Sequence, residues 1–412
     1  MKTLQTQCCI AGGGPAGMML ALLLVRAGIQ VVVLEKHQDF LRDFRGDTVH
    51  PSTLQILQEL GLLDEFLKRP HQKVQQVRVE FEGESAILAD LSHLRTAPPF
   101  IAFMPQWDFL DFIATVSRRY PGFDLRMQAE AIGLLQDKDR ITGVYANTPD
   151  GRLEIQADLV VAADGRQSLL RSKANLPVRD LGAPMDVLWF RIGRKSSDGE
   201  TILGRASRGK MIVMLNRGDY WQCAYLIRKG DFDQIRARGI PSFRNDIASV
   251  APSIADRVNE IEDWEHIRLL TVKVDRLLQW CRDGFLCIGD AAHAMSPMGG
   301  VGINVAIQDA VASANVLSTP LREGRVTRSD LQRVQRRREF PVWLMQTIQV
   351  FLQNRLIRST LGSDRPVKMP FPVKLVNWLP ILRRIPARIV GLGFRPEHVA
   401  DPAFIDIKLP HA

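Results

Sequence analysis

The chain has 412 residues, of which 46% are hydrophobic and 24% are charged, and its formal net charge is +9. These values are typical of a large globular protein with one or two domains. The five cysteines show no metal-ligand spacing, and no apolar run approaches about 18 residues, which argues against a disulfide framework, a metal site and a transmembrane helix. We therefore expect a cytoplasmic protein without a bound metal.

A glycine motif that suits a dinucleotide follows the first predicted strand. Residues 12–17 read GGGPAG, come directly after an apolar strand and open a helix rich in alanine and leucine. The next strand, residues 30–34, ends in Glu35. In a G-x-G-x-x-G motif the first glycine permits a tight turn, the second lets a pyrophosphate approach, and the third lets helix and strand pack closely. Because Glu35 can accept a hydrogen bond from a ribose 2′-hydroxyl, the pattern predicts an adenosine without a 2′-phosphate.

A second strand end in the middle of the chain also carries an acid. Residues 154–163 are predicted to form strands that close on Asp164 and Gly165, and Ser168 and Arg171 lie in the short helix that follows. Ligands of open α/β sheets bind at the carboxyl ends of the strands. The position of Asp164 after the N-terminal glycines therefore favours a second contact with the same nucleotide.

Three further β-strands are predicted between residues 183 and 275. They cover residues 187–192, 211–215 and 220–227. Alternation along the last strand places Gln222 on one face and Tyr225 on the other. One face must pack on helices while the other is left for a ligand, and the sequence does not choose between them.

The segment 285–317 is the most informative part of the chain. An apolar strand ends in Gly289 and Asp290, a loop with Pro297 and three more glycines follows, and a helix is predicted from Ile303. Such a loop brings backbone N–H groups and the positive end of a helix against a negative group. Asp290 is placed to bond a hydroxyl, such as those of a ribityl chain, and a reduced flavin is anionic along its N1/C2=O edge. One cofactor long enough to reach this loop and the N-terminal glycines is FAD.

Residues 320–412 carry the positive charge of the chain, with seventeen Arg and Lys against seven Asp and Glu. Basic clusters alternate with apolar stretches that contain Trp343, Trp378 and Leu379. Such a region either lies on an anionic membrane surface, or admits a lipophilic substrate, or forms a helical cap over the nucleotide domain. We prefer the cap, which predicts buried tryptophans and at most weak membrane-surface contact. The region shows no nucleic-acid recognition motif, so no nucleic-acid partner is expected.

Together these patterns resemble the p-hydroxybenzoate hydroxylase family, the single-component FAD-dependent aromatic monooxygenases. The resemblance covers roughly residues 5–320 and rests on three ordered motifs, which are the glycines of 12–17, Ala163-Asp164-Gly165 with Ser168 and Arg171, and Gly289-Asp290-Ala291-Ala292-His293 with Pro297, Gly300, Gly302 and Asn304. It implies an α/β fold in which a Rossmann-like FAD-binding domain is interleaved with a β-sheet substrate domain and followed by a helical C-terminal region. The expected bounds are 1–182 and 276–320 for the FAD domain, 183–275 with insertions near 70–105 for the substrate domain, and 321–412 for the helical region.

The resemblance also implies roles for individual residues. Arg45 matches an arginine on the FAD pyrophosphate, and Gln106 matches a glutamine near the ribityl chain. The implied cofactor contacts are Gly12, Gly14, Ala16, Gly17, Glu35, Lys36, Arg45, Gln106, Asp164, Asp290, Pro297, Gly300, Val301, Gly302, Ile303 and Asn304. The candidate catalytic residues are Pro297, Gly300, Arg191 and Tyr225, and the further pocket candidates are Trp189, Met214 and Gln222. His293 resembles a catalytic base, but we prefer the interpretation that it is a packed or capping histidine that shapes the loop.

The activity implied by the resemblance is hydroxylation of an aromatic or quinone-precursor small molecule. NADPH or NADH is the transient electron donor, O2 is the oxidant, and a flavin C4a-hydroperoxide delivers the oxygen atom. The protein then has to hold the substrate beside the flavin and exclude water. Two alternatives remain open, namely a flavoprotein of the same fold with other redox chemistry (a halogenase or a lipid-saturating reductase) and a non-catalytic FAD-binding protein. The W-x-W-x-I-P signature of flavin halogenases is not visible in the sequence.

Overall fold

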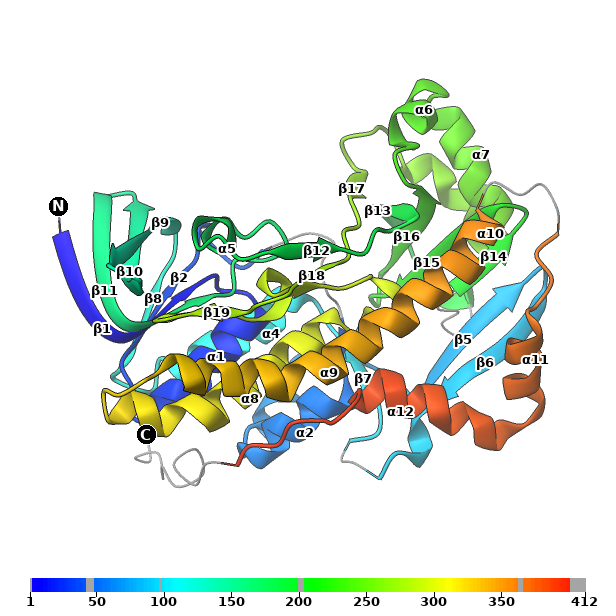
Figure 1. Cartoon of the computed structure of the whole chain (residues 1–412). Helices are drawn as coiled ribbons and strands as arrows, with labels where there is room; N and C mark the ends of the chain where they lie inside the picture. Colours follow the sequence, from blue (N-terminus) through cyan, green and yellow to red (C-terminus); the bar gives the residue numbers. More distant parts are fainter. Residues whose placement is uncertain (1, 42–47, 96–97, 199–203, 362–365, 401–412) are drawn as a thin grey trace.

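The computed structural model describes the chain apart from residues 1, 42–47, 96–97, 199–203, 362–365 and 401–412. One half of the molecule is built on an eight-stranded sheet with the order β19-β20-β11-β1-β2-β8, extended from β11 by β10 and β9 (Figure 1). Its strands are β1 (Lys2–Ala11), β2 (Val31–Leu34), β8 (Phe123–Arg126), β9 (Glu130–Asp137), β10 (Arg140–Thr148), β11 (Gly151–Ala162), β19 (Cys281–Arg282) and β20 (Phe285–Cys287). From β20 to β8 the strands are parallel.

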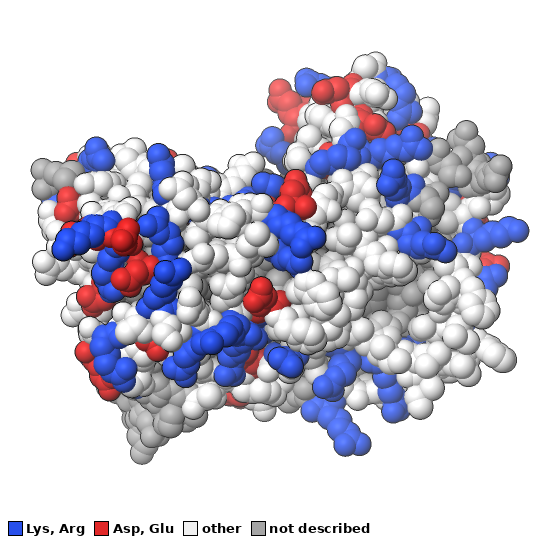
Figure 2. All heavy atoms as spheres, viewed as in Figure 1, with Lys and Arg blue, Asp and Glu red and all other residues white. Residues whose placement is uncertain are grey.

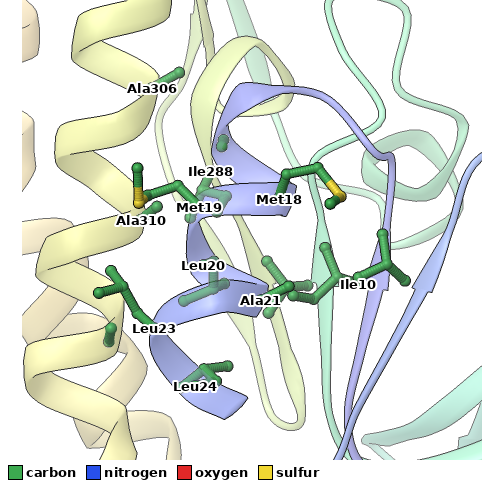
Figure 3. Packing of buried hydrophobic residues seen from close by; sticks show 14 of the residues in the cluster. Ile10, Met18, Met19, Leu20, Ala21, Leu23, Leu24, Ile288, Ala306 and Ala310 are labelled. Carbon is green, nitrogen blue, oxygen red and sulfur yellow. The ribbon is translucent and has the colours of Figure 1, made fainter. Parts of the chain in front are cut away.

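The parallel strands are buried because helices pack against the sheet. Helix α1 (Pro15–Arg26) starts directly after β1 and packs on α8 (Gly302–Arg322) and α4 (Gln106–Ser117). In Figure 3, Met19 and Leu23 of α1 point toward Ala306 and Ala310 of α8, while Met18 points toward the sheet. Strands that are buried on both faces read as continuous apolar runs, as residues 8–11 and 31–34 do.

A second sheet forms the other half, with the order β17-β13-β16-β15-β14-β5-β6. Its strands are β5 (Gln76–Phe81), β6 (Glu84–Asp90), β13 (Met185–Gly193), β14 (Gly204–Ser207), β15 (Lys210–Asn216), β16 (Tyr220–Arg228) and β17 (Arg268–Leu270). The segment near 70–105 thus contributes β5 and β6 to the sheet built by residues 183–275.

The two faces of this second sheet pack against different parts of the molecule. One face is covered by α6 (Phe232–Ala237), α7 (Ile240–Val250) and the 3-10 helix η3 (Pro252–Glu260), with Phe243 at the centre of the contact. The opposite face packs on Met298, in the loop before α8, and on Val350 of α9 (Arg328–Leu352). The second face is therefore the one turned toward the nucleotide domain.

Short elements connect the two halves. Two three-stranded sheets are formed by β12 (Val178–Asp180), β18 (Asp275–Leu277) and β21 (His293–Ala294), and by β3 (Thr48–Val49), β7 (Ile101–Phe103) and β4 (Gln72–Val74). The remaining short helices are α2 (Pro51–Glu59), α3 (Leu63–Phe66), η1 (Leu91–His93), α5 (Leu169–Lys173), η2 (Ser196–Asp198), η4 (Gly289–Ala291) and η5 (Met298–Gly300).

The C-terminal region is helical and crosses both halves of the molecule. Helix α9 begins at a capping box formed by Thr327 and Asp330 and runs from the side of the parallel sheet to the second sheet (Figure 1). It continues into the π-helical η6 (Gln353–Ile357) and α10 (Arg358–Thr360), and later come α11 (Phe371–Trp378), the 3-10 helix η7 (Pro380–Arg383) and α12 (Arg384–Leu392).

The preferred cap interpretation is wrong in one respect. It predicted buried tryptophans, whereas Trp343 is 42% exposed and Trp378 is 79% exposed. The inner face of α12 does pack on the fold through Ala387 and Gly391, so these helices cover the molecule without hiding their own large aromatic side chains.

The predicted fold class, a Rossmann-like α/β domain interleaved with a β-sheet domain, is confirmed. Within the described part of the chain, no helix has both the length and the apolar character needed to cross a bilayer.

Candidate flavin site

The three sequence motifs meet at one edge of the parallel sheet. Strands β1, β11 and β20 are parallel neighbours, so their carboxyl ends lie side by side. The glycine loop follows β1, Asp164 follows β11, and Gly289 with Asp290 follows β20. The chain continues from β1 to β2 on one side and later returns to β11 on the other, which makes this edge the switch point where open α/β sheets bind ligands.

The first and third motif glycines are required by close contacts. Gly12 has a φ of +111°, and a Cβ atom there would lie 2.3 Å from the carbonyl oxygen of Ala163. A Cβ atom on Gly17 would lie 2.0 Å from the carbonyl oxygen of Gly12. At Gly14, the N-cap of α1, an added Cβ would meet no atom of the described residues within 4 Å. The space over Gly14 is therefore open to a ligand, and the uncapped N-terminus of α1 beside it suits a pyrophosphate.

The acid at the end of β2 is held in place by backbone groups. Glu35 accepts hydrogen bonds from the backbone N–H of Gly13, at 3.1 Å, and of His37, at 3.0 Å. The carboxylate therefore lies over the glycine loop, where the ribose of a dinucleotide is bound in this fold. Lys36, next along the chain, is exposed and lines an open hollow with Gln128.

Of the next two predicted contacts, the structure describes only Gln106. Arg45 falls outside the described residues. Gln106 is the first residue of α4, where it is half-buried. Ala16 is buried in the first turn of α1, and a Cβ on Gly289 would come within 3.1 Å of its methyl group. Ala16 thus packs directly against the turn that carries Asp290.

Asp164 and Asp290 end neighbouring strands and have different surroundings. The Asp164 carboxyl accepts a bond from the N–H of Leu170 at 3.3 Å, and its other oxygen is buried with no partner among the described residues. Burial raises the pKa of Asp164, although the hydrogen bonds from the start of α5 act in the opposite direction. Asp290 is less buried and pairs with Arg166 at 3.3 Å. An acceptor that lacks a donor in the protein is suited to a ligand hydroxyl.

Arg171 connects the loop that carries Asp164 to the loop that carries Asp290. Its guanidinium binds both oxygens of Asp275, at 3.1 and 3.3 Å, and donates to the carbonyl oxygens of Arg166 and Ala291. Arg171 and Asp275 are almost fully buried. The guanidinium is thus engaged inside the protein and fixes the loop after β11 against the loop after β20.

A second buried acid supports the Gly289 turn. Asp309 on α8 accepts from the N–H of Gly289 at 3.1 Å, pairs with His293 at 2.5 Å, and accepts from Nε of Arg338 on α9 at 2.9 Å. Burial opposes the charge on Asp309, but His293 and Arg338 outweigh it and lower the pKa of this carboxyl. His293 is itself 1% exposed and bonded to Asp309, so it acts as a buried support of the turn.

The loop before α8 is shaped by glycines and held from behind. Gly299 and Gly300 have φ values of +78° and +63°, and Thr48 donates to the carbonyl oxygen of Gly300 at 3.1 Å. On the other side, Gln349 of α9 donates to the carbonyl oxygens of Ser296 and Met298. Pro297 lies half-buried within this loop, so its backbone is fixed on both flanks.

The start of α8 presents donors. Val301, Gly302 and Ile303 form the first turn of α8, which has no side-chain cap hydrogen bond among the described residues. The side-chain oxygen of Asn304 accepts from the N–H of His50 and the hydroxyl of Thr53, while its Nδ2 is buried without a partner among the described residues. These donors suit the negative edge of a reduced flavin.

The second sheet brings only some of the predicted pocket residues to this region. Trp189, Arg191 and Gln222 lie on the face turned toward the FAD domain, and Arg191 is paired in register with Gln222. Arg191 is exposed and stacks over the ring of Tyr220 at 5.0 Å. Trp189 and Gln222 each carry a buried side-chain nitrogen that has no hydrogen-bond partner among the described residues.

Tyr225 and Met214 lie on the other face, so the structure does not bring them to the site. Tyr225 packs edge-on against Phe243 of α7, with ring centroids 5.6 Å apart, and Met214 belongs to the same helix-covered core. Tyr225 is therefore withdrawn as a catalytic candidate, and Met214 is withdrawn as a pocket candidate. The sequence could not separate the two faces because β16 is buried on both, so the alternation of its side chains does not show which face meets the cofactor.

Several supporting residues were not identified from the sequence. Asp309, Arg338, His50 and the glutamines Gln346 and Gln349 all hold the flavin loop or its neighbours. The two glutamines, with Gln353, are spaced three and four residues apart on one helical face and are buried. These glutamines on one face of a long helix were the sequence signal that could have identified a polar contact. The carbonyl groups that they bind lie far away in the sequence, so the contact itself could not be predicted.

The residues of this edge fit FAD. Gly14 leaves room for a pyrophosphate, Glu35 lies at the ribose position, and Asp164 and Asn304 hold an acceptor and a donor that no described residue satisfies. Among the described residues, no cluster of three or more His, Cys, Asp or Glu side chains is arranged to hold a metal ion.

Comparisons with known proteins agree with this geometry. A family model described as FAD binding domain matches residues 5–346. The 6-methylpretetramide 4-monooxygenase of Streptomyces rimosus is 31% identical over 386 residues, which cover 93% of this chain and 92% of the relative. The para-nitrophenol 4-monooxygenase of Pseudomonas sp. (strain WBC-3) is 25% identical, covering 80% of this chain and 82% of the relative. Among solved structures, the p-nitrophenol 4-monooxygenase of Pseudomonas putida DLL-E4 has a TM-score of 0.77 at 21% identity, over 94% of this chain and 97% of that one.

The family match covers most of the chain, and the relative with 31% identity is similar over nearly its whole length. The chain belongs to the FAD binding domain family and is an FAD-dependent monooxygenase of the hydroxylase type.

Proposed function

We propose that this monooxygenase uses NADH or NADPH as a transient electron donor and hydroxylates an aromatic or quinone-precursor small molecule that carries oxygen acceptors. When bound, FAD supplies the hydride acceptor and the oxygen-activating ring. The observation that carries the proposal is the sheet face opposite the flavin loop, which combines apolar side chains with two buried donors, Trp189 Nε1 and Gln222 Nε2.

The shape of this face supports a flat, acceptor-bearing ligand. Trp189 is paired in register with Ala224, and Gln222 is the next residue on the same face of β16, so the two donors are diagonal neighbours. Such neighbours lie about 7–8 Å apart. The apolar Val213 and Leu215 of β15 share this face. A buried donor without a partner costs free energy, so a ligand carbonyl or phenolic oxygen there is favoured over a pure hydrocarbon.

The residues around the flavin edge then hold the cofactor and exclude water. Asp290 and Asp164 accept from ribityl or ribose hydroxyls, the first turns of α1 and α8 donate to the pyrophosphate and to the reduced ring, and Met298 closes the loop against the sheet. Water exclusion matters because it protects the reactive oxygen from being lost as peroxide. The names of the relatives with 31% and 25% identity, which include a phenol, also favour an oxygen-bearing aromatic substrate.

The first experiment identifies the cofactor and the reaction. The purified protein should be yellow, the released cofactor should run as FAD on chromatography, and Asp290→Ala should weaken its retention. A substrate screen scored by stimulated NADH and NADPH oxidation should yield compounds that also raise oxygen uptake. With labelled O2, one heavy oxygen atom should enter the product, and label that arrives from water would refute hydroxylation.

The second experiment tests the two donors. With a substrate in hand, Trp189→Phe and Gln222→Leu each remove one donor, and KM should rise roughly 2- to 12-fold because a net hydrogen bond contributes about 0.5–1.5 kcal/mol. Tyr225→Phe removes a polar group from the opposite face of the same sheet and serves as the matched control. Equal effects of all three substitutions would contradict the assigned face.

A further inference from the structure

The C-terminal helices carry an apolar, basic surface that packing within the chain does not explain. We call the surface formed by α11, η7 and the first turns of α12 the 371–388 surface. Its large apolar side chains are strongly exposed: Phe371 by 75%, Trp378 by 79%, Ile381 by 65% and Ile385 by 59%. Folded proteins rarely expose several such side chains along one short segment unless they bind something.

The segment is firmly attached to the fold on its inner side, so the exposure is not that of a loose tail. Ala387 and Gly391 are buried, and a Cβ on Gly391 would lie 2.9 Å from Leu91 in η1. The side chain of Asn377 accepts from the N–H of Ile87 in β6. Arg383 donates to the carbonyl oxygens at the end of α11 and thereby fixes the turn between the helices.

On the outer side, basic and apolar residues alternate. Ile381, Arg384, Ile385 and Arg388 are spaced three and four residues apart and therefore share one face, and all four are exposed. From residue 366 to 395 the sequence contains six Lys and Arg and neither Asp nor Glu. In Figure 2, Lys and Arg side chains project over α12 with uncharged surface between them.

We propose that the 371–388 surface docks on an anionic lipid bilayer. Arginine side chains beside exposed isoleucines place their charge at lipid phosphates while their stems lie among apolar groups. Tryptophan favours the boundary between headgroups and acyl chains, where Trp378 would lie. A nucleic acid would satisfy the arginines but would leave Trp378 and the isoleucines exposed, so the combination favours lipid.

The test uses the full-length protein with FAD bound and vesicle flotation. Vesicles of neutral phosphatidylcholine should bind little protein, whereas vesicles with about 30% phosphatidylglycerol should bind it in a salt-dependent manner. Arg384→Glu/Arg388→Glu should weaken partitioning by roughly 30-fold or more, because each basic residue near an anionic surface contributes about 1 kcal/mol. Trp378→Ser/Ile381→Ser should remove the binding that persists at high salt.

Matched controls make comparable charge and apolar changes on other parts of the surface. Arg236→Glu/Arg268→Glu alters the net charge equally at exposed positions of the second half, and Leu269→Ser/Leu278→Ser removes two exposed leucines, one on β17 and one directly after β18. Both controls should float like the unchanged protein. FAD content and thermal stability, measured for every variant, show that a loss of flotation is not a loss of fold.

Three results would overturn the proposal. The first is no flotation with anionic vesicles. The second is flotation that the control pairs reduce as much as the 371–388 substitutions do. The third is a dimer in solution that Trp378→Ser/Ile381→Ser dissociates, without vesicle binding, which would make the surface an interface between two copies of the chain. None of these results bears on the hydroxylase proposal, which is scored by NAD(P)H oxidation and oxygen incorporation.

Discussion

The contrast between two neighbouring arginines gives a strict test of how the flavin edge is held together. Arg171 and Arg166 lie in the same segment and each pairs with a carboxylate, but the Arg171–Asp275 pair is buried whereas Arg166 and Asp290 are about one-third exposed. Arg171→Met removes a bidentate pair and leaves Asp275 inside the protein with Lys273 as its remaining cation, at 3.2 Å.

The expected magnitudes follow from burial. Breaking a buried pair by removing one partner costs about 3–5 kcal/mol. Asp275 would lose its buried bidentate partner and keep only the contact with the partly exposed Lys273. Removing one partner of a largely solvated pair costs about 0–1 kcal/mol. Arg171→Met should therefore lower Tm by roughly 4–6 °C and Arg166→Met by at most about 1 °C, on the order of 1.2 °C per kcal/mol for a chain of 412 residues.

The assay is thermal unfolding of FAD-free protein, since bound cofactor would add its own stabilisation. The double variant Arg171→Met/Asp275→Leu should be less damaging than the sum of the single changes, because it leaves no buried charge unpaired. The opposite pattern should appear in FAD retention, where Arg166→Met removes the partner that orients Asp290. Equal Tm shifts for Arg171→Met and Arg166→Met would refute the reasoning from burial.

Further predictions concern the glycine loop and one buried histidine. Gly12→Ala should prevent FAD loading and destabilise the protein, because its Cβ would overlap the Ala163 carbonyl, whereas Gly14→Ala should fold normally and lose affinity in an FAD titration. Burial lowers the pKa of His50 from 6.5 to about 4, so the unfolded chain binds the proton more readily than the folded protein. This contribution to stability is complete above about pH 6.5, decreases by about 2 kcal/mol at pH 5, and is lost below about pH 4. Unfolding measured from pH 8 to pH 5 should therefore show a shallower loss in His50→Gln than in the unchanged protein.

The elements that could be predicted are those whose signal is local. The helix after Gly17, the strand before Glu35 and the turn at Gly289 each combine a buried apolar run with glycines at positions that demand close approach or a positive φ. The predicted strands at 211–215 and 220–227 correspond to β15 and β16 within one residue at each end. Local rules were sufficient because each of these elements agrees with the fold around it.

What could not be predicted depends on contacts between distant parts of the chain. Arg171 and Asp275 are separated by 104 positions, and the sequence around one residue does not indicate that it pairs with the other. The face of β16 that meets the FAD domain is set by where α7 packs, so Gln222 and Tyr225 were equally plausible from alternation alone. The exposure of Ile385 follows from Ala387 and Gly391, small residues that take the inner face of α12 and leave this large side chain outside.

The C-terminal region contributes buried polar contacts to the flavin site, which a separate cap would not do. The family match ends at residue 346, yet Gln349 holds the loop at Met298, and the carbonyl of Val390 accepts from the ring of His50 beside Gly300. Arg338 of α9 neutralises Asp309, which in turn fixes the Gly289 turn. The same helices therefore support the cofactor edge with their buried polar groups and present the 371–388 surface with their outer side. Hydrogen bonds from the ring of His50 to Val390 and from its backbone to Asn304 therefore join α12 to the start of α8.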